Sequence, residues 1–572
     1  MSEIRNKDII KTLKVTALLL DLHDENQFKI RSWENAAIFL ERVQKPLVQM
    51  DAKEIAAIEG VGKTIAGAIV QLIEKGSFDL LEELTQKTPK GLLELTDIKG
   101  IGAKKIRQIW KELNIDTVEG LLDACHKGSI AQLKGFGAKT QENMISLLEF
   151  TIAQRGKLRY ADAEILANAL MHQLQKQFPQ AQLEWVGEYR RRCEVISVLE
   201  LLAIKTLRRD IITFLKSIDS LEYNAQESGP FTYTGRDKQC GLLIVVHFSD
   251  EAKYYNNLLL YTGSATHLEG ISNNGETLME VIMKETLEQE SEAYEKLGLP
   301  YIIPELREGK NELQWAKNGT MPKLLEYQDF KGLIHAHSTY SDGQHSLKAM
   351  AEACKALNFE YLGISDHSRS AFYARGLELE KIQEQHREID VLNNSLEPFV
   401  IFKGIESDIL SDGSLDYDEA TLQSFDFVIA SIHSNLNMNR EKATKRLLNA
   451  IANPYTTILG HPTSRLLLKR EGYPIDHKTI IDACAHYNVI IEINANPWRL
   501  ELDWRWIQYA LEKGVLLSVN PDAHQISGIE DMKYGLHVAR KGGLDARNTL
   551  NTWSAIEVKK YFENRKQKIS HG

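Results

Sequence analysis

The stretch Gly332-Leu-Ile-His-Ala-His-Ser-Thr-Tyr-Ser-Asp-Gly343 reads as a short apolar strand that runs into two histidines and an aspartate. Side chains alternate faces along a strand, so His335 and His337 point to the same side and Ala336 points away. Two imidazoles on one face, followed by the Asp342 carboxylate in the next turn, are an arrangement typical of metal ligands. The stretch therefore predicts one edge of a metal site.

Six further apolar, strand-like runs follow this stretch, and most of them end in a residue that can bind a metal. Helical-looking segments separate the runs, and alternation of strand and helix predicts a parallel sheet. Seven such units are enough to close a barrel, in which functional residues lie at the C-terminal ends of the strands. The polar residues at those ends are Asp366, His367, Glu406, Asp408, His433, His461, Glu492, Asn494, Asn496, Asp522 and His524.

Repetition of His, Asp and Glu at the same end of successive strands predicts a site for several metal ions. Imidazole and carboxylate ligands suit Zn or Mn, and the lack of thiolates argues against a structural zinc or an iron–sulfur cluster. Several ions with open coordination positions favour phosphoester hydrolysis. Amide hydrolysis and deamination stay open on the residue types alone.

Residues 329–572 resemble a PHP (polymerase and histidinol phosphatase) domain, which is a distorted (βα)7 barrel with a trinuclear metal centre. The resemblance implies three divalent ions, Mn or Zn, and a Glu406 carboxylate that bridges two of them. It also implies that Glu406, Asp522 and His433 are catalytic. The metal ligands that it implies are His335, His337, Asp342, His367, Glu406, His433, His461, Asp522 and His524.

The segments 461–466 and 493–500 are similar to the version of this domain found in bacterial family X DNA polymerases. Each segment contains an arginine, and the fork of a guanidinium matches the geometry of a phosphate. Arg465 and Arg499 are therefore candidate phosphate contacts.

The N-terminal part repeats one pattern three times: apolar, any residue, Gly, apolar, Gly, and then a helix with small and basic residues. The glycines allow a tight hairpin between two helices, and the amides at the start of the second helix can hold a DNA phosphate. The pattern resembles the helix-hairpin-helix motif and predicts sequence-independent, salt-dependent DNA binding. The expected contacts are Gly60, Gly62, Lys63, Gly100, Gly102, Lys104, Gly135, Gly137 and Lys139.

Residues 155–315 resemble the rest of a family X polymerase core, so the resemblance spans nearly the whole chain. Nucleotidyl transfer needs clustered carboxylates that hold two Mg²⁺ ions. In this resemblance the two paired aspartates align with Val198 and Glu200, and the third aligns near Leu242. The serine that contacts the triphosphate aligns with Glu188, whose charge repels a nucleotide. The expected palm is folded but does not polymerise.

Length and composition agree with a globular protein of three or more domains, with 572 residues and a net charge of −10. The five cysteines are scattered without a CxxC pair, which fits a reducing cytoplasm. No N-terminal apolar segment or membrane-spanning run is present in the sequence. We expect a cytoplasmic monomer whose partner is DNA, as gapped or 3′-ended duplex, with no membrane partner.

The expected fold class is multidomain, α+β and α/β, with a helical N-terminal region, a degenerate nucleotidyltransferase palm and a C-terminal barrel. The expected domains are residues 1–80 with the first hairpin, 81–154 with the second and third hairpins, 155–250 as the palm, 251–315 as the polymerase C-terminal subdomain, 316–328 as a linker and 329–572 as the PHP domain.

The favoured function is a metal-dependent 3′–5′ exonuclease that acts in DNA repair. One alternative is a gap-filling polymerase with an accessory exonuclease, in which Glu194, Glu200 or Asp210 replaces the missing carboxylates. Further alternatives are a small-molecule phosphatase resembling histidinol phosphatase and a DNA-bound scaffold.

Overall fold

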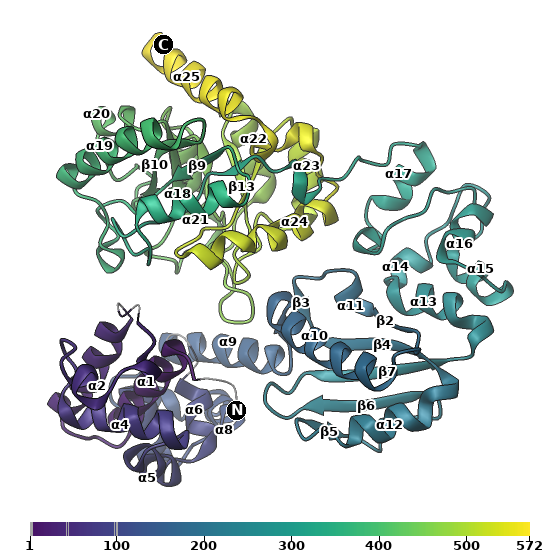
Figure 1. Ribbon diagram of the computed structural model, residues 1–572, viewed down its shortest axis with the longest axis horizontal. Coiled ribbons are helices and arrows are strands. Elements are labelled where there is room, and N and C mark those ends of the chain that lie inside the picture. The colour runs from purple at the N-terminus through teal and green to yellow at the C-terminus, as the bar shows by residue number, and fades with distance from the viewer. Residues whose placement is uncertain (1–3, 42, 44, 97, 99–100, 572) are drawn as a thin grey trace. The chain divides into compact units, whose positions relative to one another are not determined.

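The computed structural model describes residues 4–41, 43, 45–96, 98 and 101–571 (Figure 1). The chain divides into two compact units, residues 1–155 and 156–572. Each unit has buried hydrophobic clusters of its own. Among the described residues, no helix combines the length and the apolar character that a membrane crossing requires.

The described part of residues 1–155 is built of helices, and local signals set several of their ends. A capping box on Asp51 begins α3, and the Thr117 side chain accepts the N–H of Gly120 at the start of α8. Gly76, with a left-handed backbone, ends α4. The helices are α1 Asn6–Leu22, α2 Gln27–Leu40, α3 Ala52–Ala56, α4 Lys63–Lys75, α5 Asp79–Lys87, α6 Lys90–Thr96, α7 Ala103–Leu113, α8 Val118–His126 and α9 Ala138–Gln154, with short 3-10 turns η1 Leu47–Gln49 and η2 Ile130–Gln132.

The second unit begins with a five-stranded sheet in the order β2-β4-β7-β6-β5. The central strands β4 and β7 are parallel, and the other neighbours are antiparallel. Leu199 and Leu201 of β4 and Ile244 and Val246 of β7 are buried at alternate positions, as a strand packed on a core requires. The strands are β2 Leu183–Val186, β4 Val198–Ile204, β5 Leu221–Tyr223, β6 Thr232–Asp237 and β7 Leu243–Ser249, and the helices beside them in Figure 1 are α10 Tyr160–Gln177, α11 Gly187–Arg190 and α12 Arg208–Lys216.

A helical segment follows the sheet and packs around its own small core. Its buried His267 lies between two partners, with Nδ1 2.8 Å from Glu312 Oε1 and Nε2 3.0 Å from the hydroxyl of Tyr294. The helices are α13 Tyr254–Thr262, α14 Ala265–Leu268, α15 Leu278–Lys284, α16 Glu290–Lys296 and α17 Glu312–Asn318.

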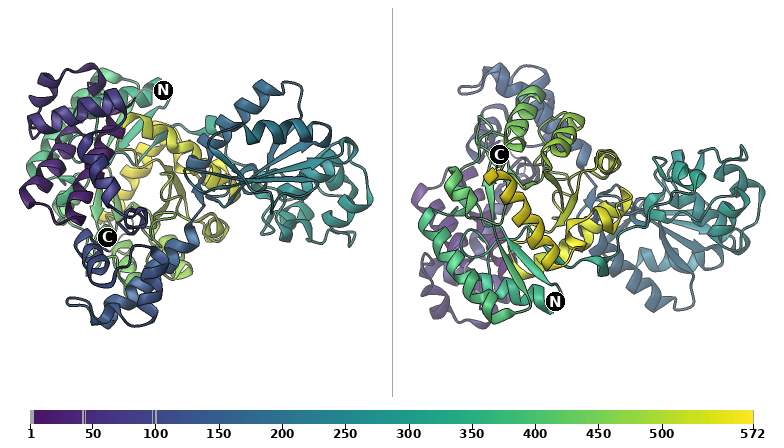
Figure 2. Two further views of the ribbon diagram at one scale, coloured as in Figure 1. Left: turned by 90° about the horizontal axis from the view of Figure 1, so that it is seen from below. Right: turned by 90° about the horizontal axis from the view of Figure 1, so that it is seen from above.

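The C-terminal half is a barrel of seven parallel strands, paired in chain order from β8 to β14. Figure 2 shows its helices, green to yellow, around the strands. The strands are β8 Gly332–Leu333, β9 Tyr361–Ile364, β10 Val400–Asp408, β11 Phe427–Ser431, β12 Ile458–Leu459, β13 Ile490–Asn494 and β14 Leu517–Asn520. The helices are α18 Leu347–Ala356, α19 Leu379–Leu396, α20 Glu419–Gln423, α21 Arg440–Ile451, α22 His477–Tyr487, α23 Ile507–Glu512, α24 Met532–Lys541 and α25 Ala555–His571.

A single parallel bridge between Ala336 and Ala523 joins the chain just beyond the first and last strands. The N–H of His337 donates to the carbonyl of Ala523 over 2.9 Å, which strengthens this seam. The barrel is therefore nearly closed, and the predicted (βα)7 architecture is confirmed. Closure places residues that follow the first strand, β8, next to residues that follow the last strand, β14.

Candidate metal centre and nucleic-acid interface

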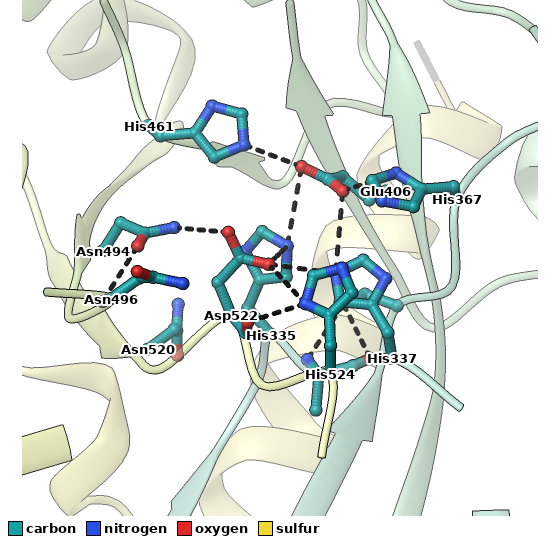
Figure 3. A network of polar contacts seen from close by, with 12 residues as sticks. His335, His337, His367, Glu406, His461, Asn494, Asn496, Asn520, Asp522 and His524 are labelled. Atoms are coloured by element: carbon teal, nitrogen blue, oxygen red, sulfur yellow. Dashed lines mark hydrogen bonds and ion pairs between the residues drawn. The ribbon is translucent and has the colours of Figure 1, made fainter. Parts of the chain in front are cut away.

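The structure brings all nine predicted metal ligands to the C-terminal end of the barrel. Figure 3 labels His335, His337, His367, Glu406, His461, Asp522 and His524. Most of the nine ligands lie in the loops that follow the C-terminal ends of the strands. Their side chains meet at that end of the barrel. His335 and His337 come two and four residues after β8, and His461 and Asp522 come two residues after β12 and β14, respectively. This is the placement that the strand-end pattern predicts for a parallel barrel.

Glu406, near the end of β10, lies at the middle of the cluster. Its Oε1 is 2.9 Å from His461 Nε2, 3.2 Å from His433 Nε2 and 3.5 Å from His335 Nε2. Its Oε2 is 2.9 Å from His367 Nδ1 and 3.7 Å from His337 Nε2. One carboxylate thus faces five imidazoles with both of its oxygens, as a bridging ligand requires.

Two further carboxylates lie beside Glu406 and face some of the same imidazoles. Asp522 Oδ1 is 3.1 Å from His337 Nε2 and 3.5 Å from His335 Nε2. Asp342 Oδ1 is 3.4 Å from His524 Nε2 and 3.7 Å from His367 Nε2. Three groups of side chains are spaced closely enough to hold a metal: His337, Asp342, His367 and His524; His335, His337 and Asp522; and His367, Glu406 and His433.

Burial differs across the cluster. His335 and His337 are fully buried and Glu406 is 1% exposed, whereas the side chains of Asp342 and His524 are 31% and 34% exposed. The cluster is therefore recessed and opens to solvent on the side of Asp342 and His524.

The carboxylates and imidazoles of the cluster shift each other's pKa values in both directions. Neighbouring carboxylates outweigh burial and raise the pKa of His433 to about 10 and that of His524 to about 9. Burial alone would raise the pKa of Glu406, but His433, His335 and His367 outweigh burial and hold that pKa well below its usual range. Burial and the neighbouring His524 and His367 lower the pKa of His337 to about 3, so its imidazole is neutral at neutral pH. Anionic carboxylates and neutral imidazoles are the forms that coordinate metals.

The donor set fits divalent metal ions. Among the described residues, His335 Nε2 and His337 Nδ1 are buried without a hydrogen-bond partner. Buried polar atoms normally have a partner, and a cation between these atoms would supply one. The PHP-type site can therefore hold metal ions through nitrogen and oxygen ligands, and the cysteines of the chain are not among the three groups.

Two carboxylates behind the histidines were recognised in the sequence only as polar strand ends. Glu492 Oε1 lies 2.6 Å from His335 Nδ1, and its Oε2 accepts the backbone N–H of His461 over 2.9 Å. Asp408 Oδ1 lies 2.5 Å from His433 Nδ1. Such partners set the tautomer and orientation of a metal-binding imidazole. An acidic residue within an otherwise apolar strand, as at Glu492, is the signal that could have revealed this role.

The two candidate phosphate contacts differ in their surroundings. Arg499 Nε is 3.5 Å from Asp522 Oδ2, and its Nη1 is buried without a hydrogen-bond partner among the described residues. Arg465 instead donates to the carbonyl of Arg499 over 2.7 Å and to Asp503 over 2.8 Å. Arg465 thus holds the segment that carries Arg499. Arg499 is the arginine that faces the cluster with an N–H that has no partner among the described residues.

The positions aligned with polymerase ligands are either apolar or hydrogen-bonded to other residues of the five-stranded sheet region. Leu242 is buried and Val198 is apolar, so neither can bind a metal. Glu200 Oε1 lies 3.0 Å from His247 Nε2, and Glu188 accepts the backbone N–H of Ser197. Among the described residues, the three groups able to hold a metal all lie in the barrel.

The arginines next to Glu188 are also occupied. Arg190 forms a two-pronged pair with Glu290, with N–O distances of 2.9 and 2.8 Å, and Arg191 Nε donates to Glu308 over 3.0 Å. Glu194, one of the acids that could have replaced a missing ligand, pairs with Arg505 at 2.8 Å. These side chains form ion pairs within the protein.

Three hairpin turns in the first unit carry the predicted DNA contacts. Gly62, Gly102 and Gly137 are the N-caps of α4, α7 and α9, and Lys63, Lys104 and Lys139 lie exposed at the starts of the same helices. Gly60 and Gly135 have the left-handed backbone of a tight turn, with φ of +76° and +86°. Gly100 lies outside the described residues.

The three N-cap glycines have a shared property that bears on ligand binding. A Cβ added at Gly62, Gly102 or Gly137 would meet no heavy atom within 4 Å, and their φ values are negative. Packing within the unit therefore does not demand glycine at these positions. Open space in front of free helix N-terminal amides suits the close approach of a phosphate.

Comparisons with known proteins agree with this division. A helix-hairpin-helix domain model matches residues 4–78, a SAM-like helix-hairpin-helix tandem model matches residues 92–149, and a PHP domain model matches residues 334–496. A protein of Bacillus subtilis named DNA polymerase/3′-5′ exonuclease PolX is 33% identical over 571 residues, which cover 98% of this chain and 100% of the relative.

Other relatives match about a third of this chain. A probable phosphatase of Thermoanaerobacter is 32% identical over 191 residues, which cover 32% of this chain and 75% of the relative. A probable phosphatase of Caldanaerobacter subterraneus is 30% identical over 194 residues, covering 32% of this chain and 74% of the relative.

Proposed function

Because this chain belongs to the bacterial family X DNA polymerases that carry helix-hairpin-helix regions and a C-terminal PHP domain, we propose that it is a 3′–5′ DNA exonuclease of DNA repair. In this proposal the barrel hydrolyses the DNA strand, the hairpins hold the DNA backbone, and the palm does not polymerise. The observation that carries the proposal is the recessed cluster in which Glu406 faces five imidazoles.

The nine clustered residues would hold the metal ions, Mn or Zn, with Glu406 shared between two of them. Metal ions bound there supply an activated water and neutralise charge on the phosphate. We assign catalytic roles to Glu406, Asp522 and His433, which set the positions of the ions. Glu492 and Asp408 hold His335 and His433 in the orientation that the site needs.

Arg499 is the proposed phosphate contact. The Arg499 guanidinium lies beside the cluster, with its Nε 3.5 Å from Asp522 Oδ2, and its Nη1 has no hydrogen-bond partner among the described residues. Nη1 can therefore donate to a phosphate oxygen at the cluster. Arg465 supports this role by binding the carbonyl of Arg499. The phosphodiester reaches the cluster from the exposed side, where Asp342 and His524 lie.

The proposed lack of polymerase activity rests on the palm. Val198 and Leu242 cannot bind Mg²⁺, Glu200 is paired with His247, and the neighbouring Arg190 is paired with Glu290. Two ions flanked by clustered carboxylates are required for nucleotidyl transfer. Gap filling remains the second candidate because the full-length relative has both polymerase and exonuclease in its name.

A small-molecule phosphatase is the third candidate, since two relatives that match about a third of this chain are probable phosphatases. The three hairpins with exposed lysines at the helix starts favour DNA over a small phosphate ester.

One gel tests the three candidates together. A 5′-labelled duplex with a one-nucleotide gap is incubated with Mn²⁺, with and without deoxynucleotides, and with wild type, His335→Ala and Glu406→Ala. His486→Ala, which removes an exposed histidine of α22, is the matched control. The exonuclease shortens the primer, and only the two cluster variants abolish shortening. Extension by the wild type would instead establish a working palm, and an unchanged primer together with hydrolysis of a small phosphate ester would establish a phosphatase.

A further inference from the structure

Two large aromatic side chains stand exposed beside the metal cluster. Phe372 and Tyr373 are 84% and 70% exposed and occupy the short 3-10 turn η7 Phe372–Ala374, in the loop that follows the predicted ligand His367. Single exposed apolar residues are common on protein surfaces. Two adjacent rings at the edge of a recessed polar site are less easily explained by packing.

Backbone hydrogen bonds and buried alanines fix the loop that carries these rings. Ala371 and Ala374 are buried, and the N–H of Ala374 donates to the carbonyl of Ala371 over 2.9 Å. The N–H of Ser370 donates to Asp416 over 2.6 Å, and that of Leu377 donates to the carbonyl of His367 over 2.8 Å. The loop is therefore anchored at both ends, and it presents the two rings outward.

The Tyr373 ring lies close to the metal cluster, and Phe372 is its neighbour in the same turn. The Tyr373 ring centroid is 6.2 Å from that of His367. Neither ring carries a charge at physiological pH, since the ordinary pKa of a phenol is about 10. A neutral ring does not repel the negative backbone of a nucleic acid.

Exposed neutral rings beside a phosphodiester site are what single-stranded nucleic acid recognition uses, because every base presents a flat face to an aromatic side chain. The cluster is recessed, with its deepest ligands fully buried. A paired strand end is wider than one strand and must unpair before its terminal phosphodiester can enter, which costs free energy.

We propose that Phe372 and Tyr373 form a base-stacking platform that receives the unpaired 3′-terminal nucleotides of a DNA strand and feeds their phosphodiester to the metal cluster. This inference rests on the proposed exonuclease function and adds the residues that would hold the strand end, Phe372 and Tyr373.

The test compares two full-length proteins on matched substrates. Wild type and Phe372→Ala/Tyr373→Ala act on a 5′-labelled duplex with a three-nucleotide unpaired 3′ tail and on the same duplex with an abasic tail, which keeps the phosphates and lacks the bases. Stacking of one or more bases predicts that the double variant lowers kcat/KM on the normal tail by about 5- to 150-fold. On the abasic tail the two proteins should differ by less than about twofold.

Three controls make the outcome specific. Tyr487→Ala removes an exposed tyrosine at the C-terminal end of α22 and should cleave both tails like the wild type. Phe372→Tyr/Tyr373→Phe keeps both rings and should restore the preference for the normal tail. Melting curves confirm that the alanine variant is folded.

Equal losses on the normal and abasic tails, or no loss on either, would overturn the platform while leaving the exonuclease in place. A wild type that hydrolyses bis(p-nitrophenyl) phosphate but shortens neither tail would overturn the exonuclease and the platform with it. Faster wild-type cleavage of a fully paired 3′ end than of the unpaired tail would contradict the proposed binding of unpaired nucleotides.

Discussion

At the scale of single residues, the site depends on acids that lie behind the ligands as much as on the ligands. His335 is held between Glu492 on its Nδ1 side and the carboxylates of Glu406 and Asp522 on its Nε2 side. The Nδ1 contact leaves Nε2 as the nitrogen that faces the cluster. Glu492 also accepts the amide of Asn520 over 3.2 Å, so its own position is fixed.

We therefore expect Glu492→Gln to lower the affinity for Mn²⁺ and the rate of DNA hydrolysis by about 10- to 100-fold. A neutral amide supports the imidazole less well than a carboxylate does. Mn²⁺ titration by calorimetry and the dependence of the rate on Mn²⁺ concentration measure the effect. Glu471→Gln, at an exposed loop position, serves as the control. Unchanged Mn²⁺ affinity in Glu492→Gln would rule out the positioning role.

A second residue-scale effect concerns the ion pairs that join the palm to the helical segment after it. Burial alone would raise the pKa of Glu290, but its contacts with Arg190 and Arg307 outweigh burial and lower that pKa to about 2. Arg307 Nη1 is 2.6 Å from Glu290 Oε1. The folded-state pKa lies below the ordinary value of 4.5. The pair therefore stabilises the fold at neutral pH, and this contribution is lost as pH falls from about 4.5 to 2.

Glu290→Gln should reduce stability at pH 7 by about 3.5 kcal/mol, because folding lowers the pKa of Glu290 from 4.5 to about 2 and each tenfold change in that equilibrium corresponds to about 1.4 kcal/mol. The difference in Tm from the wild type should shrink as the pH is lowered from 5 towards 3. Thermal unfolding followed by circular dichroism measures both values, with Glu288→Gln as the exposed control. A Tm difference that does not change with pH would contradict the assignment.

At the scale of elements, the three hairpins repeat one device, in which a glycine N-cap leaves the first amides of a helix accessible. α4, α7 and α9 each begin in this way, and each has an exposed lysine within its first two residues. The helix dipole and the lysine both favour a phosphate at this end. Binding of this kind holds the backbone and does not read the sequence.

Replacement of Lys63, Lys104 and Lys139 by alanine should weaken DNA binding, and the plot of log K against log salt should become less steep by about 0.9 for each lost contact on duplex DNA. Fluorescence anisotropy at several salt concentrations gives the slope. The matched triple variant Lys7→Ala/Lys11→Ala/Lys75→Ala changes the net charge equally at exposed positions outside the turns. The same slope change in both triple variants would show that only net charge matters.

At the scale of the whole molecule, the two units divide binding and chemistry between them. Residues 1–155 have their own hydrophobic cluster, whereas in residues 156–572 the palm sheet and the barrel share one. The buried Lys541 of the barrel reinforces this join, since it donates to the carbonyl of Arg191 over 2.9 Å. A palm without polymerase ligands thus has a packing role beside the barrel.

The fragment 156–572 should therefore keep its activity on bis(p-nitrophenyl) phosphate and lose about 100-fold in kcat/KM on DNA, because a linked binding module raises the effective concentration of the substrate. Steady-state rates of the fragment and the full chain on both substrates measure this. The fragment with Glu406→Ala should be inactive on both. An undiminished kcat/KM on DNA would mean that the barrel unit binds DNA without the hairpins.

The sequence by itself determined the barrel, the hairpins and the identity of the clustered side chains. The reason is that these depend on local patterns: alternation along a strand places His335 and His337 together, and repeated strand–helix units place every strand end at one side. The glycine spacing of the hairpins is equally local.

Only the tertiary structure decided which groups meet across the barrel. His335 and Glu492 are 157 residues apart in the chain and are brought to 2.6 Å by closure of the strands. The same closure placed Glu406 between five imidazoles and separated the roles of Arg465 and Arg499. It also left Phe372 and Tyr373 exposed, although aromatic residues in a sequence usually indicate core. Contacts between distant segments depend on packing and hydrogen bonding that local periodicity does not encode.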